Sequence, residues 1–249
     1  MSDKLTEDVI LGGRVRLRQP ATGYRAATDP VLLAAACAAK PGERVLDLGC
    51  GAGAAILCLA ARVPGLDLHG LELQPAYAAL ARVNAALNGA PLSVHEGDVA
   101  APPPALKAVS FDHVILNPPW FDETAPASPD PGRDAARRAG AAGVALWIDA
   151  ALRRLRQGGR LTLIHRAARL GAILGALEGR AGDAAILPLT ARQGRDAGRV
   201  IVTARKDIHA PLRLCAPLAL HAGAGHDGDG DDFSAQAAAV LRDAAALTF

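Results

Sequence analysis

The sequence is poor in several residue types that would point to particular kinds of protein. Only 4 of its 249 residues are cysteine, with no CxxC pair and no histidine at the spacing of a structural zinc site. Aromatic residues make up 3% of the chain, so the core has to be built from Ala, Leu, Val and Ile. We therefore expect neither a disulfide framework nor a metal site.

The chain also lacks a long uncharged apolar run. No segment approaches the roughly 20 apolar residues that cross a bilayer, and the polar start at residues 1–4 precedes no signal-peptide core. A cytoplasmic location is therefore expected, with a monomer or weak dimer as the assembly. Hydrophobic residues make up 51% of the chain, which excludes an intrinsically disordered protein and favours one globular α/β domain.

Charge is balanced over the whole chain but not along it. The sequence has 27 basic and 25 acidic residues, yet nine arginines and only two aspartates lie between Arg133 and Arg169. This segment predicts either a polyanion-binding surface or a solvated helix face, and both interpretations stay open. The acidic, glycine-rich residues 226–232 lack the Gly and Glu of a calcium loop, so we expect a solvated loop there.

Apolar segments of strand length recur through the chain, mostly separated by segments of helix length. Such alternation predicts a mainly parallel sheet with helices on both faces, closed by an antiparallel hairpin where the last two strands follow each other directly. The expected strands are 44–48, 66–71, 92–95, 111–116, 160–165, 185–189 and 199–204. The expected helices are 29–40, 54–63, 75–88, 144–156, 170–177 and 234–247, and a Gly-Gly pair within 9–17 predicts a separate N-terminal β-hairpin.

A glycine turn follows the first of these strands and opens a helix. The segment Val45-Leu46-Asp47-Leu48-Gly49-Cys50-Gly51-Ala52-Gly53 lets the backbone approach a ligand closely. Glu72, about 20 residues further on at the end of the next strand, is suited to accept both hydroxyls of a ribose. Asp98 follows the third strand and could accept from the amine of an adenine. These features predict a nucleoside-containing cofactor, held also by the neighbouring Leu73 and Val99 and by Asn117 after the fourth strand.

Two cofactors fit this signature. The spacing Gly49-x-Gly51-x-x-Ala54 satisfies the dinucleotide fingerprint, so NAD has to be considered. A pyrophosphate, however, favours a turn free of carboxylates, whereas Asp47 suits the ammonium group of S-adenosyl-L-methionine (SAM). The charge of Asp47 therefore favours SAM.

The fourth strand runs into the tetrapeptide Asn117-Pro118-Pro119-Trp120. The two prolines fix an extended backbone, so the side-chain carbonyl of Asn117 and the main-chain carbonyl of Pro118 can point at one site. Two acceptors of this kind can orient an exocyclic amine for attack on a methyl sulfonium, and Trp120 offers a stacking face for a planar base. We therefore interpret these four residues as the catalytic segment.

Together these motifs resemble the class I SAM-dependent methyltransferases, and in particular the methyltransferase small domain group. The sequence is most similar to the bacterial tRNA (adenine-N6) methyltransferases that modify the adenine just 3′ of the anticodon in a valine tRNA. The resemblance extends over about residues 11–205 and implies a seven-stranded, Rossmann-like class I methyltransferase sheet. Residues 1–28 would form an N-terminal hairpin and cofactor-covering segment, and residues 29–249 the methyltransferase domain.

The resemblance also implies roles for residues outside the two motifs. Arg18-Gln19-Pro20, Gly23-Tyr24-Arg25 and the segment 28–33 resemble the family's sequence before its first core strand. The residues that would close over the methionine end of the cofactor are Gln19, Tyr24, Arg25 and Asp29. The segment 133–137 resembles the Arg-Asp-x-Ala-Arg that follows the tetrapeptide in the family, and the residues expected to contact RNA phosphates are Arg133, Arg137, Arg138 and Arg199.

The acceptor is not fixed by these motifs. Trp120 stands where the family usually has Tyr or Phe, and the tetrapeptide also occurs in guanine-N2 rRNA enzymes and in the glutamine-N5 methyltransferases of release factors. It selects an amino or amide nitrogen without choosing among them. Methylation of adenine N6 in tRNA is the leading hypothesis. An NAD-linked oxidoreductase and a non-catalytic RNA-binding module are the alternatives from other classes.

Overall fold

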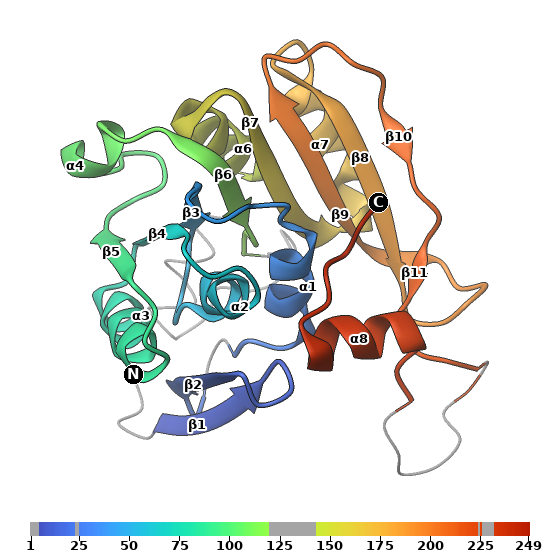
Figure 1. The fold of residues 1–249 in the computed structure, drawn as a ribbon. Coiled ribbons are helices and arrows are strands. Elements are labelled where there is room, and N and C mark those ends of the chain that lie inside the picture. Colours follow the sequence, from blue (N-terminus) through green and yellow to red (C-terminus); the bar gives the residue numbers. More distant parts are fainter. Residues whose placement is uncertain (1–4, 23–24, 120–142, 224, 226–231) are drawn as a thin grey trace.

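The computed structural model describes residues 5–22, 25–119, 143–223, 225 and 232–249. Within them the chain folds around one nine-stranded sheet with the order β10-β8-β9-β7-β6-β3-β4-β5, and β11 also pairs with β8 (Figure 1). The strands of this sheet are β3 (Arg44–Leu48), β4 (Asp67–Glu72), β5 (Leu92–Glu96), β6 (Phe111–Leu116), β7 (Leu155–Arg166), β8 (Ala181–Thr190), β9 (Ala197–Lys206), β10 (Arg213–Leu214) and β11 (Leu218–Ala219).

The seven long strands are those expected from the sequence. β3 to β7 pair in parallel, and β9 is antiparallel to both of its neighbours, β7 and β8, which confirms the predicted terminal hairpin. The two-residue strands β10 and β11 extend the sheet beyond β8 and were not predicted. The carboxyl ends of β3, β4, β5 and β6 therefore lie along one edge of the sheet, which we call the carboxyl edge, opposite the amino edge.

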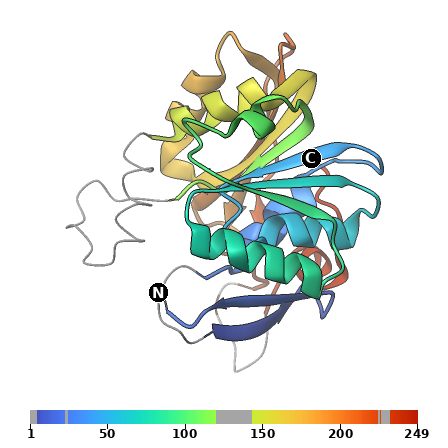
Figure 2. The ribbon, with the colours of Figure 1, turned by 90° about the vertical axis from the view of Figure 1, so that its left-hand side faces the viewer.

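Helices cover both faces of the sheet (Figure 2). One apolar cluster includes residues of α1, α2 and α8, and the other includes residues of α6 and α7 on the opposite face. β3 is buried between them, because Val45 belongs to the first cluster and Leu46 to the second. The helices are α1 (Thr28–Ala36), α2 (Ala54–Arg62), α3 (Pro75–Leu87), α4 (Pro104–Lys107), α6 (Gly143–Arg154), α7 (Leu170–Leu177) and α8 (Ala235–Asp243).

The N-terminal hairpin is a separate two-stranded sheet of β1 (Leu5–Ile10) and β2 (Val15–Pro20). β2 alternates between buried and exposed residues, and its buried Val15 and Leu17 join the cluster formed with α1 and α2. No residue of β1 is buried to that degree. Apolar burial therefore holds the hairpin mainly through β2, and Ile10 of β1 packs against the same cluster while only partly buried.

Several boundaries differ from those expected. α1 ends at Ala36 instead of residue 40, because Cys37 takes an extended backbone and the Arg62 guanidinium binds the carbonyl oxygens of Ala34 and Cys37. The predicted loop around residues 102–104 leads into the short helix α4. β7 begins at Leu155, five residues before the expected start, since Leu155 already pairs with Phe111 ahead of a register shift.

Candidate active site

The glycine turn lies between β3 and α2, at the carboxyl edge. Gly49, Gly51 and Gly53 all have positive φ angles, of 73°, 56° and 91°, which is the region that glycine adopts without steric cost. A Cβ added to Gly51 would meet no atom of the described part of the chain within 4 Å, so those residues leave the turn open on that side. A nucleoside cofactor can approach the backbone there.

Trp147 of α6 packs directly against the first glycine of this turn. A Cβ at Gly49 would lie 2.8 Å from the Trp147 ring, so a larger residue at position 49 would displace the indole. Trp147 is only 6% exposed, and its buried Nε1 has no hydrogen-bond partner among the residues that the structure describes. Sequence reasoning missed this residue, because a tryptophan within an apolar helix gives no signal of its own.

Glu72 connects the glycine turn to the start of α3. It is 7% exposed, and its carboxylate accepts the backbone N–H of Gly51 at 2.9 Å and of Gln74 at 2.8 Å. Burial raises the pKa of Glu72, and these N–H groups oppose the shift by stabilising the anion. A carboxylate has about four lone-pair positions, so Glu72 can still accept from ribose hydroxyls.

Asp47 lies beneath the first turn of α2. Burial and the nearby negative charge of Glu72 raise the pKa of Asp47 to about 7, against the effect of a hydrogen bond donated by the Ile56 N–H. Asp47 is 3% exposed, so no solvent compensates its charge. The donors around both carboxylates are backbone groups, and a cationic ligand at the turn would be attracted to the pair.

The adenine end of the predicted cofactor site includes an exposed carboxylate. Asp98 follows β5, is exposed, and accepts the Ala100 N–H at 2.9 Å. Leu73 is 41% exposed although it is apolar, whereas Val99 is buried. An exposed leucine beside Glu72 offers an apolar surface on which a base could rest. The thiol of Cys50 is turned towards Gly70 instead, and burial raises its pKa well above the usual range.

The tetrapeptide begins beside the glycine turn. Leu116 and Leu48 are paired across β6 and β3, so Asn117 and Gly49 leave neighbouring strands at the same edge. Asn117 is half-buried and Pro118 is buried. Trp120 lies outside the described residues, so its predicted stacking role is an expectation only.

The residues expected to cover the cofactor make contacts of their own. Gln19 donates to Asp8 of the hairpin at 2.9 Å and accepts the Ala26 N–H at 2.7 Å, and Arg25 pairs with Asp8 at 2.7 Å. Asp29, in the first turn of α1, forms an ion pair with Arg199 of β9. Tyr24 lies outside the described residues.

Two arginines of the arginine-rich segment pair with aspartates of other strands. Arg156 pairs with Asp112 at 2.5 Å and Arg160 with Asp183 at 3.0 Å. Asp112 is the second residue of β6, so these pairs lie at the amino edge, away from Asn117. These two arginines are therefore ion-paired, whereas Arg166 and Arg169 lie at the opposite end of β7, near the carboxyl edge. Outside the described residues are Arg133, Arg137 and Arg138.

A search of the described residues for three or more metal-ligating side chains finds no group that could hold a metal ion. Among the same residues, no helix is long and apolar enough to span a membrane.

A model of the methyltransferase small domain family matches residues 27–173, more than half of the chain. The chain belongs to this family. The match includes the glycine turn, Glu72, Asp98 and Asn117. This methyltransferase is SAM-dependent, and SAM is its cofactor. NAD is therefore set aside, as the charge of Asp47 indicated.

Named relatives agree with the family. A tRNA1(Val) (adenine(37)-N6)-methyltransferase from Shewanella amazonensis is 37% identical over 123 residues, which cover 49% of this chain and 52% of that protein. A protein of the same name from Yersinia pestis is 33% identical over 152 residues, with coverages of 56% and 59%. The chain thus matches little more than half the length of these curated relatives.

A solved structure is similar over a longer stretch. The crystal structure of a predicted O-methyltransferase from Agrobacterium tumefaciens is 30% identical, and the superposition covers 88% of this chain and 98% of that one with a TM-score of 0.69. The class I methyltransferase fold expected from the sequence is confirmed by this match together with the strand order.

Proposed function

We propose that this methyltransferase transfers the methyl group of SAM to the exocyclic N6 amine of an adenine in tRNA. The observation that carries the proposal is the position of Asn117-Pro118-Pro119 at the carboxyl end of β6, directly beside the glycine turn that follows β3. A methyl donor at the turn and an amine held at Asn117 would then be neighbours.

The residues proposed to hold SAM lie on successive strand ends of the carboxyl edge. The glycine turn would receive the methionine part, with Asp47 supplying negative charge, while Glu72 would accept from the ribose and Asp98 from the adenine amine. The open space beside Gly51 and the exposed Leu73 fit a ligand of this shape. The proposed covering residues, in the segment 1–28 and at the start of α1, are Gln19, Tyr24, Arg25 and Asp29.

The proposed methyl transfer requires the protein mainly to orient the amine and the methyl donor. Bound SAM supplies an electrophilic methyl group. The Asn117 side-chain oxygen and the Pro118 carbonyl oxygen would accept the two hydrogens of the amine and direct its lone pair, and Trp120 would stack on the base. The amine loses its proton after the new bond has formed, so water can take it and no strong general base is required.

The choice of tRNA is supported by the names of the Shewanella and Yersinia relatives. An RNA substrate also requires cationic contacts to phosphates, for which we propose Arg133, Arg137, Arg138 and Arg199. A cytoplasmic enzyme would be the consequence, because its substrate is there.

The test is mass spectrometry of nucleosides from tRNA incubated with the protein and labelled SAM. Wild-type protein should give N6-methyladenosine, and Asn117→Ala should reduce the rate at least about 100-fold with little change in SAM affinity or melting temperature. Arg44→Ala, far from Asn117 at the amino edge, is the control and should keep full activity.

Other products would contradict the proposal in distinguishable ways. N2-methylguanosine or a methylated ribose oxygen would change the acceptor within RNA. Unmodified tRNA beside a release factor methylated on glutamine would make the substrate a protein. RNA binding without transfer to any of these acceptors would indicate a non-catalytic module.

A further inference from the structure

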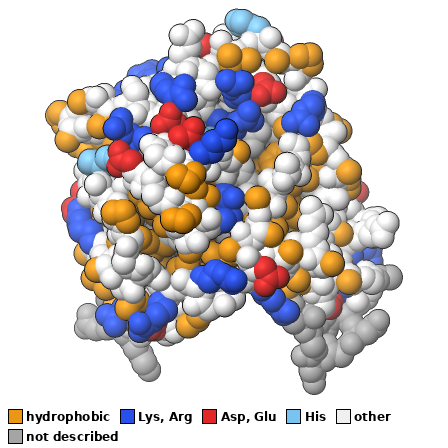
Figure 3. Space-filling model, in the orientation of Figure 1, with side chains coloured by type: hydrophobic (Ala, Val, Ile, Leu, Met, Phe, Trp, Pro, Cys, Tyr) orange, Lys and Arg blue, Asp and Glu red, His pale blue; other side chains and the backbone are white. Residues whose placement is uncertain are grey.

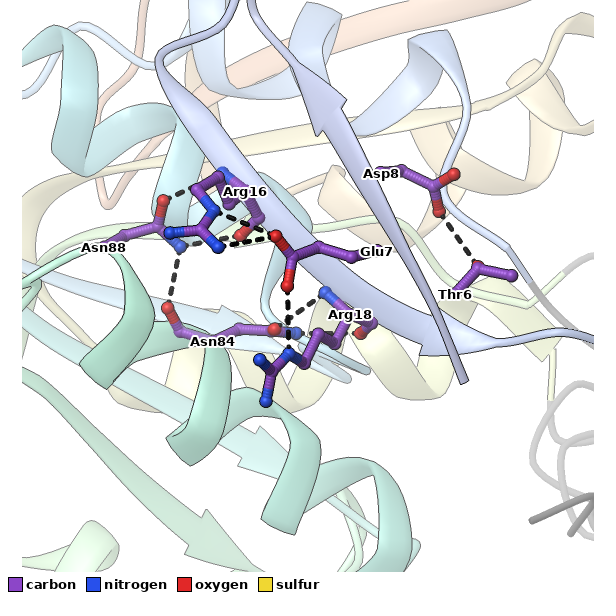
Figure 4. Close-up of polar contacts among 7 residues, drawn as sticks. All are labelled: Thr6, Glu7, Asp8, Arg16, Arg18, Asn84 and Asn88. Carbon is purple, nitrogen blue, oxygen red and sulfur yellow. Dashed lines mark hydrogen bonds and ion pairs between the residues drawn. The ribbon is translucent and has the colours of Figure 1, made fainter. Parts of the chain in front are cut away.

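Two asparagines, Asn84 in α3 and Asn88 at its C-cap, bind the main chain of the N-terminal hairpin (Figure 4). Asn84 accepts the Arg18 N–H at 2.8 Å and donates to the Arg18 carbonyl at 3.0 Å. Asn88 does the same for Arg16, at 2.9 and 2.7 Å. The two amides thus bind the edge of β2 that faces away from β1, in the manner of a neighbouring strand.

Asn84 makes one further contact, which reaches the glycine turn. Its side-chain nitrogen also donates to the carbonyl oxygen of Ala52, at 2.9 Å. Ala52 lies between Gly51 and Gly53, and the Gly51 N–H is bound by Glu72 from β4. The turn is therefore held on two consecutive residues by side chains, one an acceptor and the other a donor.

Backbone bonds already hold both ends of the turn, because the Gly49 and Cys50 N–H groups donate to the Leu71 carbonyl and the Gly53 N–H donates to the Cys50 carbonyl. Asn84 adds a bond to the Ala52 carbonyl, which these backbone bonds do not reach. Glycines at positive φ lose more conformational freedom on folding than any other residue, and the turn has few side chains of its own to pack. Asn84 is 0% exposed, so its hydrogen bonds do not compete with water. Removing them would leave the Ala52 carbonyl free to rotate.

Asn88 offers a natural comparison. It binds the hairpin with the same geometry, but the remaining bond of its side chain goes to the Asn84 carbonyl, at 2.7 Å, in the last turn of α3. Asn88 thus contributes to docking the hairpin without a bond to the turn. Comparing the two residues therefore distinguishes the effect of docking the hairpin from the effect of supporting the turn.

We propose that Asn84 is a positioning residue that couples docking of the N-terminal hairpin to the shape of the glycine turn, and so sets the affinity for SAM. This inference rests on the proposed placement of SAM at that turn. Because coupling between sites is reciprocal, SAM should in turn strengthen the docking of β2.

The experiment compares Asn84→Ala with Asn88→Ala. Calorimetric titration should show SAM affinity lowered roughly tenfold by Asn84→Ala and less than about twofold by Asn88→Ala. The KM for SAM should rise with Asn84→Ala while kcat at saturating SAM stays near wild type, because the residue touches neither substrate nor reacting atoms. Equal effects of the two variants on SAM affinity, or no effect of either, would overturn the inference.

Hydrogen exchange gives a second readout. In wild type, SAM should slow exchange of the Arg18 amide, and in Asn84→Ala that protection should disappear. An Arg18 amide whose exchange is unaffected by SAM in wild type would contradict the coupling. Should Asn84→Ala fail to fold, Asn84→Ser is the variant to use, since its hydroxyl can donate to one of the two carbonyls and should lower affinity by an intermediate factor.

A further variant, Glu72→Ala, distinguishes an error in the proposed SAM site from an error in the proposed role of Asn84. If Glu72→Ala leaves SAM affinity unchanged, SAM does not lie at the turn, and both the proposed site and the role of Asn84 are wrong. If Glu72→Ala abolishes binding while Asn84→Ala behaves like Asn88→Ala, the site stands and only the coupling fails.

Discussion

Acidic residues at the two edges of the central sheet lie in opposite environments. At the carboxyl edge Asp47 and Glu72 are buried, their donors are backbone N–H groups, and burial raises both pKa values. At the amino edge Asp67 is half exposed and pairs with Arg44 at 2.8 Å, which lowers its pKa. Figure 3 shows basic and acidic side chains next to one another over the upper part of the molecule.

This difference in environment suits the carboxyl edge to binding a ligand and the amino edge to supporting the fold. An arginine beside a carboxylate neutralises it, so the amino edge has little charge left to offer a ligand. Asp47 and Glu72 keep negative charge in a buried place, which destabilises the unliganded protein but prepares it for a cation. Substitutions at the two edges should therefore differ in their effects on SAM affinity and on the stability of the fold.

The largest effect is expected from Asp47→Asn. At pH 8 it should lower SAM affinity about 10- to 100-fold, the range of a lost hydrogen bond or contact to a charged group, and raise the melting temperature of the unliganded protein. Asp112→Asn at the amino edge is the matched control and should lower stability but leave SAM affinity unchanged. Calorimetric titration and thermal unfolding measure both, and equal affinity losses would remove the distinction between the edges.

The pH dependence of Asp47 has a defined sign. Its folded pKa is about 7 and the ordinary value is 3.8, so between these values the folded state keeps a proton that the unfolded state has lost. The stability contributed by this group is complete below about pH 4 and is lost as pH rises through 7. Urea unfolding at several pH values should show that the free energy of unfolding of Asp47→Asn rises relative to that of wild type over this interval. SAM affinity of the wild type should fall below pH 7, and a flat profile would contradict the assignment.

Arg199→Ala tests an ion pair at the carboxyl edge that resembles those at the amino edge. It should lower the free energy of unfolding by about 1–3 kcal/mol at pH 8, because Asp29 would remain as an uncompensated, largely buried charge. Burial raises the pKa of Asp29 and Arg199 opposes the shift, so without the arginine the pKa should rise further. The loss should therefore be smaller at pH 4 than at pH 8. Arg199→Lys should recover most of it, and a loss independent of pH would argue against the pair.

The smallest effect is expected from Arg44→Ala. Its partner Asp67 is half exposed, so the variant should cost less than about 1 kcal/mol, and added salt should reduce the cost. Because the pKa of Asp67 is lowered in the folded state, this contribution is lost as pH falls, opposite in sign to that of Asp47. Urea unfolding with and without added salt measures this cost in stability. A cost of several kcal/mol would mean that the amino edge stabilises more than its exposure indicates.

The sequence predicted the parts of the site that depend on backbone requirements. Positive φ at Gly49 and Gly51 and the fixed backbone at Pro118 follow from residue type, and the seven long strands follow from apolar runs of the right length. Trp147 and Asn84 could not be predicted in this way, because their contacts come from elements distant in sequence. Asn84 within α3 was nevertheless a usable signal, since Asn favours a helix interior poorly unless its side chain has a partner.

The arginine-rich segment shows the limit of charge counting. Nine arginines within 37 residues were compatible with a polyanion-binding surface or a solvated helix face, and Arg156 and Arg160 pair with Asp112 and Asp183, which are distant in sequence. Local net charge does not reveal such pairing, because the compensating residues come from other strands.

The place of β9 between β7 and β8 has a consequence for the growing polypeptide. β8 is synthesised before β9, but β9 separates it from β7, so β8 has no place in the sheet until residues 197–206 have left the ribosome. Until then the edge of β7 stays unpaired and open to other chains. A stalled or truncated product ending before residue 197 should therefore aggregate, although it already contains the complete glycine turn and Asn117.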